Sequence, residues 1–208
     1  MKILHIDSSI TGPQSVSRKL SATVIERLKQ LHQDAEIIYR DVCSPEIPHQ
    51  SNKLIQFKMN LAKGDHKINT DTLIQHQYDL VNGVLEEFLA ADVVVVGVPM
   101  YNLSIPSQLK CWIDSVSVAG KTFRYTETGP QGLCAGKKVI IASVRGGIYS
   151  TPEAKTNDHE ERYLISLFNF LGISDVSIIR AEGVNISPEF QEKAMGEALS
   201  EIEEFTLV

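Results

Sequence analysis

The stretch Asp92-Val93-Val94-Val95-Val96-Gly97 decides the fold class. Four consecutive β-branched residues favour a strand, and the run has no polar side, which indicates burial on both faces. Strands buried on both faces belong to parallel sheets that helices cover on each side. We therefore expect an α/β protein whose parallel sheet is covered by helices on both faces.

Outward from this strand, apolar runs alternate with segments of helical period. The other expected strands are 3–6, 36–39, 138–142 and 176–180. Helices are expected over 15–31, from Pro106 to about Ala119, around 164–171 and from Pro188 onward. Two less regular helices are expected, one over 50–62 and one that starts at 70–72 and buries residues 81–89. The Gly-, Thr- and Pro-rich segment 120–136 predicts a long loop, and the role of 42–72 stays unassigned.

Composition excludes several classes of function. The 208 residues are 43% hydrophobic with a net charge of −6, typical of one globular domain over 1–208. Three cysteines without a CxxC motif predict neither disulfides nor a cysteine zinc site, so we expect a reducing, cytoplasmic location. The apolar run at the start of the sequence is too short for a signal peptide. The longest apolar run, 93–100, is too short to span a membrane. The sequence has a negative net charge and no block of Lys or Arg, so nucleic-acid binding is disfavoured.

A parallel sheet binds its ligands at the carboxyl ends of its strands. After residues 3–6 comes a Ser-rich loop that enters a helix, where backbone N–H groups and the hydroxyls of Ser9, Ser15 and Ser17 favour a phosphate. The loop lacks the GxGxxG and Gly-Lys-Ser/Thr motifs, so a mononucleotide phosphate bound without a metal fits best. Simple capping of the helix by Ser explains this loop about equally well.

Two further strand ends carry candidate ring contacts. Met100, Tyr101 and Asn102 lie between Pro99 and Pro106, and such a stiff apolar and polar mixture suits a flat heteroaromatic ring. The segment Arg145-Gly146-Gly147 places free N–H groups beside a cation, which would stabilise negative charge on that ring. The alternatives are a packed turn at the first segment and an ordinary tight turn at the second.

Several motifs in order resemble one known family. They are Pro99-Met100-Tyr101-Asn102, Thr122-Phe123-Arg124-Tyr125-Thr126-Glu127, Gly129-Pro130, Gly132-Leu133, Arg145-Gly146-Gly147 and Ala181-Glu182-Gly183. With these motifs the chain resembles, nearly end to end, the FMN-dependent NADH-azoreductases, which are flavodoxin-like enzymes related to quinone reductases. The resemblance implies a flavodoxin-like, doubly wound, five-stranded parallel sheet with helices on both faces.

The resemblance also implies a site. FMN would lie at a homodimer interface, and NADH would be the co-substrate for reduction of quinones and azo compounds. Because a flavin carries the redox chemistry and no GxGxxG motif gives NADH a site of its own, we expect no catalytic side chain and a ping-pong mechanism. The implied cofactor contacts are Ser9, Ser15, Val16 and Ser17 at the phosphate, Met100, Tyr101, Asn102 and Leu103 at the ring, and Val144, Arg145, Gly146 and Gly147 along its polar edge. Family members often have Ser in place of Val144 and Phe in place of Leu103, so this chain lacks a hydroxyl and some aromatic wall.

Four other functions are weighed against this one. A flavodoxin-type electron carrier would share the phosphate loop, but it would not need the long segments 42–72 and 120–136. A general NAD(P)H:FMN reductase is a second alternative. A receiver domain is disfavoured because Asp7 is followed by Ser8 and no Asp ends the strand at 92–97. A flavin-free α/β domain would be colourless and would bind no added FMN.

Overall fold

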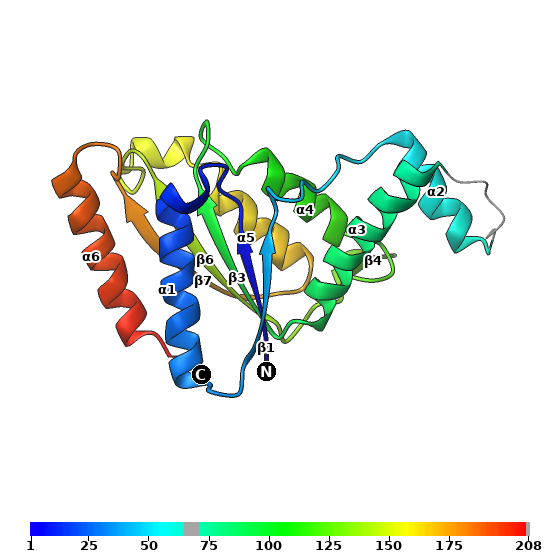
Figure 1. Ribbon diagram of the computed structural model, residues 1–208, viewed down its shortest axis with the longest axis horizontal. Helices are drawn as coiled ribbons and strands as arrows, with labels where there is room; N and C mark the ends of the chain where they lie inside the picture. The colour runs from blue at the N-terminus through cyan, green and yellow to red at the C-terminus, as the bar shows by residue number, and fades with distance from the viewer. Residues whose placement is uncertain (65–70, 207–208) are drawn as a thin grey trace.

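A five-stranded parallel sheet forms the centre of the computed structural model, which describes residues 1–64 and 71–206 (Figure 1). Its strands are β1 (Lys2–Asp7), β2 (Glu36–Asp41), β3 (Val93–Pro99), β6 (Lys138–Arg145) and β7 (Asp175–Glu182), in the order β2-β1-β3-β6-β7. This is the flavodoxin-like order of doubly wound sheets. All seven residues of the central strand β3 are buried, which confirms the expectation from its unbroken apolar run.

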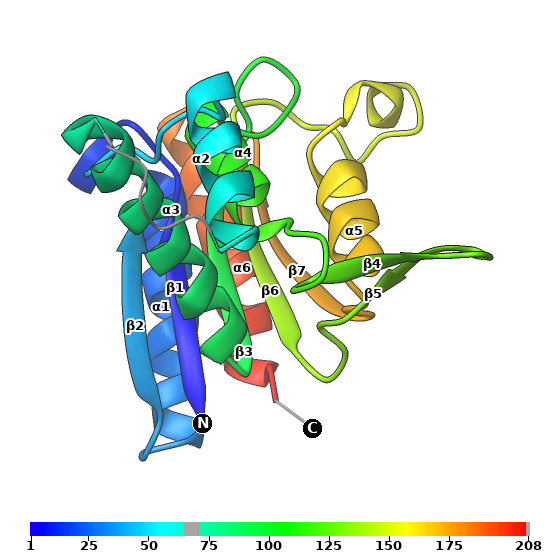
Figure 2. The same ribbon diagram turned by 90° about the vertical axis from the view of Figure 1, so that its right-hand side faces the viewer.

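Helices cover both faces of the sheet (Figures 1 and 2). One face packs against α1 (Val16–Leu31) and α6 (Pro188–Glu204); the other packs against α3 (Thr72–Ala90), α4 (Ser107–Val116) and α5 (Glu161–Phe170). The outer helix α2 (Asn52–Ala62) lies on α3, with the Phe57 and Tyr78 rings 5.2 Å apart. Short 3₁₀ turns are η1 (Gly12–Gln14) and η2 (Ala154–Asn157). No helix among the described residues is long and apolar enough to cross a bilayer.

Two helix ends show where local signals are sufficient and where they are not. Asp71 caps α3 by accepting a hydrogen bond from the Leu73 N–H, as expected, while Thr70 lies outside the described residues. The expectation that α4 continues to about residue 119 is wrong, because it ends at Val116. The buried Thr122 hydroxyl donates to the Val116 carbonyl (2.7 Å) and accepts from the Val118 N–H (2.9 Å), which replaces a further helical turn.

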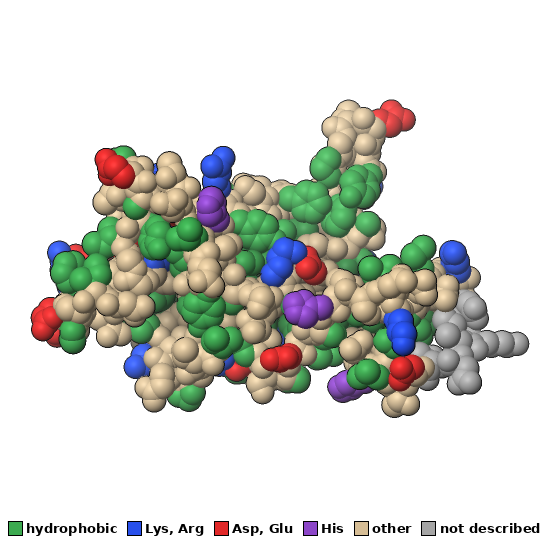
Figure 3. Space-filling view, turned by 90° about the horizontal axis from the view of Figure 1, so that it is seen from above, with side chains coloured by type: hydrophobic (Ala, Val, Ile, Leu, Met, Phe, Trp, Pro, Cys, Tyr) green, Lys and Arg blue, Asp and Glu red, His purple; other side chains and the backbone are tan. Residues whose placement is uncertain are grey.

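The segment predicted as one long loop, 120–136, contains a β-hairpin instead. Strands β4 (Phe123–Thr126) and β5 (Gly129–Gly132) pair with each other and not with the main sheet. Only the base of the hairpin is packed, where Phe123 meets Phe170 with ring centroids 4.7 Å apart. The rest forms an arm that projects from the body (Figures 2 and 3). Strands of four mainly polar, Gly- and Pro-containing residues carry too little periodicity to be predicted.

Gly97 of β3 brings the first helix close to the sheet. A Cβ atom at this position would lie 2.9 Å from Asp7 Oδ1, 3.0 Å from the Ser17 carbonyl oxygen and 3.0 Å from Ser21 Oγ. No side chain fits that space without moving buried atoms. The amino-terminal turn of α1 therefore rests directly on the carboxyl end of the central strand, at the edge where ligands are expected.

Candidate functional site

A cavity of about 300 Å³ opens at the carboxyl edge of the sheet. Three strand-end loops that are distant in the sequence meet there, together with the residues that follow β7. The lining residues are Ser9, Thr11, Gln14, Ser15, Val16, Ser17, Pro99, Met100, Tyr101, Val144, Gly146, Val184 and Asn185. Eight of these are sequence-predicted site residues. The predicted residues Asn102, Leu103, Arg145 and Gly147 do not line this cavity.

The first wall of the cavity is the amino terminus of α1. Ser15 caps the helix by accepting a hydrogen bond from the Arg18 N–H (3.3 Å), and its Oγ lies 2.9 Å from Ser17 Oγ. Within the described residues, the N–H groups of Val16 and Ser17 have no hydrogen-bond partner. Two free N–H groups, two hydroxyls and the positive end of the helix dipole form a donor set suited to a phosphate.

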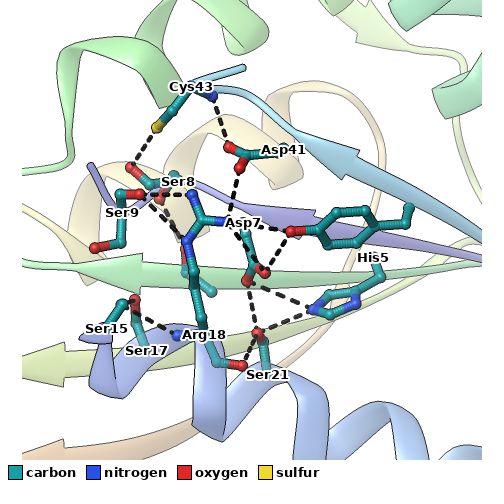
Figure 4. A network of polar contacts seen from close by, with 12 residues as sticks. His5, Asp7, Ser8, Ser9, Ser15, Ser17, Arg18, Ser21, Asp41 and Cys43 are labelled. Carbon is teal, nitrogen blue, oxygen red and sulfur yellow. Dashed lines mark hydrogen bonds and ion pairs between the residues drawn. The ribbon is translucent and has the colours of Figure 1, made fainter. Parts of the chain in front are cut away.

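A cationic side chain behind this wall fixes the loop that follows β1. The Arg18 guanidinium donates to the Ser9 carbonyl from Nη2 (2.7 Å) and Nε (3.3 Å), and to Asp41 Oδ2 from Nη1 (2.7 Å) (Figure 4). The hydrogen bond to Asp41 raises the pKa of Arg18 above its ordinary value. Arg18 therefore stays charged and ties the candidate phosphate loop to the end of β2. It does not line the cavity itself.

Beneath the loop lies a Ser, His and Asp cluster that the sequence spacing did not reveal. Ser21 Oγ donates to Asp7 Oδ1 (2.8 Å), and His5 Nε2 lies 3.0 Å from Ser21 Oγ (Figure 4). Tyr39 also donates to Asp7, and burial, followed by the Asp7 charge, raises the pKa of Tyr39 to about 12. Ser21 is fully buried, so no substrate reaches its hydroxyl, and the cluster supports the loop rather than carrying out catalysis.

The opposite wall follows β3. The Met100 N–H donates to the Val144 carbonyl (2.8 Å), and Tyr101 and Ser104 bond each other across a tight turn. Asn102 and Leu103, the central residues of that turn, have φ values of 49° and 71°. A positive φ is unusual for Leu and costs about 1–2 kcal/mol, a strain typical of binding loops. The Tyr101 hydroxyl lies 3.1 Å from Ser9 Oγ and so joins this wall to the phosphate loop.

The third wall is the turn after β6, and its carbonyls are all occupied. The carbonyls of Arg145, Gly146 and Gly147 accept hydrogen bonds from the N–H groups of Val184 (3.1 Å), Asn185 (3.1 Å) and Gly183 (2.9 Å), respectively. No described residue accepts a bond from the N–H groups of Gly146 and Gly147. The turn therefore keeps two free N–H donors, and one of them, that of Gly146, belongs to a residue that lines the cavity.

The guanidinium of Arg145 is not where sequence reasoning placed it. The side chain is 2% exposed and forms ion pairs with Asp158 (3.0 Å), Glu161 and Glu182 (3.0 Å). It therefore cannot place its charge beside a ligand in the cavity. Its partners lie at the start of α5 and the end of β7, and Glu182 also accepts from the Tyr149 N–H (3.0 Å). Arg145 thus anchors the turn from below.

Glu160 adds an acid to this network. Its Oε1 accepts a hydrogen bond from Ser143 (2.6 Å), while no described residue pairs with Oε2, and the side chain is fully buried. Burial raises the pKa of Glu160 to about 8. The carboxyl is therefore protonated at neutral pH, which limits the negative charge gathered around Arg145.

Glu160→Gln should make the stability of the fold less dependent on pH. Unfolded Glu160 ionises near 4.5, whereas folded Glu160 keeps its proton up to about pH 8, so the wild type loses stability as pH rises through this interval. Compared with Glu160→Gln, the wild type should lose at most about 1.4 kcal/mol of unfolding free energy per pH unit in this interval. Urea unfolding at pH 5 to 9 measures it, with the exposed Glu203→Gln as control. A constant difference between Glu160→Gln and wild type would contradict the assignment.

A second cavity, of about 590 Å³, adjoins the first and shares Tyr101 with it. Its lining includes Asn102, Ile105, Cys111 and Tyr163, which combine apolar and polar groups. In the part of the chain that is described, no group of three or more His, Cys, Asp or Glu side chains is arranged to hold a metal ion.

The strand order and the cavity at the carboxyl edge define a flavodoxin-like α/β domain, and residues 1–206 match a family model described as "Flavodoxin-like fold". Over 204 residues the chain is 53% identical to an FMN-dependent NADH:quinone oxidoreductase from Rhizobium meliloti (strain 1021), covering 98% of this chain and 96% of that protein. The chain belongs to this family of flavodoxin-like FMN-dependent NADH:quinone oxidoreductases.

Two solved structures are also similar. An azoreductase from Bacillus anthracis strain Sterne matches with a TM-score of 0.86 and 30% identity, covering 97% of this chain and 96% of that one. An FMN-dependent NADH-azoreductase from Bacillus anthracis strain Ames Ancestor, solved in complex with FMN, matches with a TM-score of 0.85 and 28% identity, covering 97% of each chain. The resemblance found in the sequence motifs is thereby confirmed.

Proposed function

We propose that this protein is an FMN-dependent NADH oxidoreductase that reduces quinones and cleaves aromatic azo compounds, and that residues 1–208 form one FMN-binding domain. One observation carries the proposal: a single cavity joins the helix terminus at Ser15–Ser17, the wall at Met100–Tyr101 and the turn at Gly146. The relatives named for these activities support it.

The residues present fit FMN. The free N–H groups of Val16 and Ser17, with the hydroxyls of Ser9, Ser15 and Ser17, would hold the phosphate. Met100 and Tyr101 would contact the ring, whose polar edge would face the N–H group of Gly146. The free N–H group of Gly147 lies beside it in the same turn, although Gly147 does not line the cavity. Asn102 and Leu103 lie outside this cavity; Asn102 lines the second one, whereas Leu103 lines neither.

Bound FMN would supply the hydride chemistry, while the protein supplies binding, orientation and electrostatics. The donors at Gly146 and Gly147 would stabilise negative charge at the edge of a bound ring, because their carbonyls are already held by the 183–185 segment. Arg145 acts only through this turn, since its guanidinium is enclosed by acids. Within this proposal no side chain has to act as a nucleophile.

We further propose that NADH and the acceptor occupy one site in turn. The sequence has no GxGxxG motif that would give NADH a nucleotide-binding module of its own. Initial rates measured at several fixed quinone concentrations should therefore give parallel double-reciprocal lines. Converging lines would reject the shared site while leaving FMN binding intact.

An electron carrier is the main competing function. The 590 Å³ cavity beside Tyr101 favours an enzyme, because a carrier needs only an exposed flavin edge and no pocket for a small aromatic acceptor. The visible spectrum of the purified protein, before and after anaerobic NADH, tests flavin binding and reduction. Steady-state oxidation of NADH that depends on added quinone then distinguishes the enzyme from a carrier.

A homodimer is part of the same proposal, and the hairpin arm supports it. Tyr125 on β4 is 76% exposed, although its ring lies 5.5 Å from that of Phe123. Apolar side chains gather near the base of this arm, while its tip stands clear of the body (Figure 3). An exposed aromatic residue on a projecting hairpin is a typical anchor for a second copy.

Tyr125→Asp should weaken the dimer at least about tenfold, because it replaces an apolar anchor with a charge. Sedimentation at micromolar concentration should give about twice 23.1 kDa for the wild type and a shift towards the monomer for the variant. Glu127→Gln, at the hairpin tip, is the control and should stay dimeric. A wild-type monomer with full activity would overturn the dimer proposal.

A further inference from the structure

The segment that follows β7 is bonded to the turn that follows β6. Three successive N–H groups, those of Gly183, Val184 and Asn185, donate to three successive carbonyls, those of residues 147, 145 and 146. These bonds fix the position of Asn185 relative to Gly146. Sequence reasoning missed Asn185 because nothing in the motif around it indicates this contact.

The Asn185 side chain lies directly against Gly146. A Cβ atom on Gly146 would be 2.6 Å from Asn185 Nδ2, and the next nearest atoms, at 3.3 and 3.4 Å, also belong to Asn185. Gly146 thus leaves room for the carboxamide, which lines the same cavity as Ser15, Ser17 and Met100. The side chain is exposed, and no described residue forms a hydrogen bond with its carboxamide.

A carboxamide offers one acceptor and two donor hydrogens. The phosphate donors gather at the α1 terminus around Ser17, whereas Asn185 lies at Gly146, on the wall assigned to the ring edge. Between a phosphate and a ring, FMN carries a chain of hydroxyls, each of which donates and accepts as an amide does. A phosphate dianion only accepts, so the amide oxygen would oppose it.

We propose that Asn185 is an FMN contact that hydrogen-bonds a ribityl hydroxyl. The inference rests on the proposed FMN binding and goes beyond it by assigning a residue outside the predicted site. Gly146 then has two roles, since it presents its own N–H group and makes space for the neighbouring amide.

Titration of the apo-protein with FMN and with riboflavin tests the assignment by flavin fluorescence, without measuring turnover. Asn185→Ala should lower the affinity for both flavins by a similar factor of about three to ten, which corresponds to the loss of one neutral hydrogen bond. The exposed Asn52→Ala, on α2, is the control and should change neither affinity. Unchanged affinities would overturn the proposal, and a loss confined to FMN would show a phosphate contact instead.

Gly146→Ala supplies an independent test. In the wild-type background the Cβ of the new alanine would displace the Asn185 amide and lower the affinity for both flavins by a similar factor. In the Asn185→Ala background only an ordinary 3.4 Å contact with Cβ remains, so the second change should add little. Fully additive losses would contradict the proposed link. If the wild-type apo-protein binds neither flavin, the proposed function itself fails, which is a different outcome.

Discussion

Ser17→Asp should abolish FMN binding while the protein stays folded. Ser17 is the second residue of α1, is 1% exposed and lies 2.9 Å from Ser15 Oγ. A carboxylate near a helix amino terminus is favourable in itself, so the change should not unfold α1. The same carboxylate would face a phosphate dianion, and we expect a loss of at least about 3 kcal/mol, more than a hundredfold in affinity.

Fluorescence titration and gel filtration with FMN measure this loss. Riboflavin, which has no phosphate, should bind Ser17→Asp and the wild type with much more similar affinities. Ser107→Asp is the matched control, because Ser107 is an exposed first-turn residue of α4 outside the 300 Å³ cavity. Wild-type affinity of Ser17→Asp for FMN would show that the phosphate lies elsewhere.

Arg145→Ala should produce the largest loss of stability, about 3–5 kcal/mol in the free energy of unfolding. Removing the guanidinium leaves Asp158, Glu161 and Glu182 without a cation that each of them pairs with in the folded protein. Glu161 keeps its bonds to Arg180, which limits the loss at that position.

Urea unfolding of the apo-protein measures this loss. Arg124→Ala on β4 is the control, because that exposed side chain bonds only Gln131 among the described residues, and its change should stay within about 0.5 kcal/mol. An Arg145→Ala deficit below about 1 kcal/mol would mean that the buried ion pairs do not hold the turn.

Local sequence was sufficient for most of the fold. The valine run of β3 and the helical period of α1 each indicate which sides of the element are buried. The reason is that apolar residues recur at a fixed spacing within the segment itself. The hairpin at 123–132 has no such repeat and depends on the contact between Phe123 and Phe170, which are distant in the chain. Its strands could therefore not be predicted from composition.

The candidate site divides in the same way. Ser15, Ser17 and Met100 could be predicted, since topology sends every strand end to one edge and backbone donors there need no particular partner. The position of the Arg145 side chain depends on acids at 158, 161 and 182, which sequence spacing does not connect to it. Asn185 enters the cavity only through backbone bonds between two loops.

Gly97 shows that a binding site can depend on an empty volume. It lines no part of the 300 Å³ cavity, yet any side chain there would push against Asp7, Ser17 and Ser21 and lift the helix terminus from the strand. In a saturation-mutagenesis map this position should tolerate no replacement, like a residue that touches the ligand. Engineering that alters flavin preference should therefore vary the cavity wall and hold position 97 constant, because the spacing between strand and helix is itself part of the recognition surface.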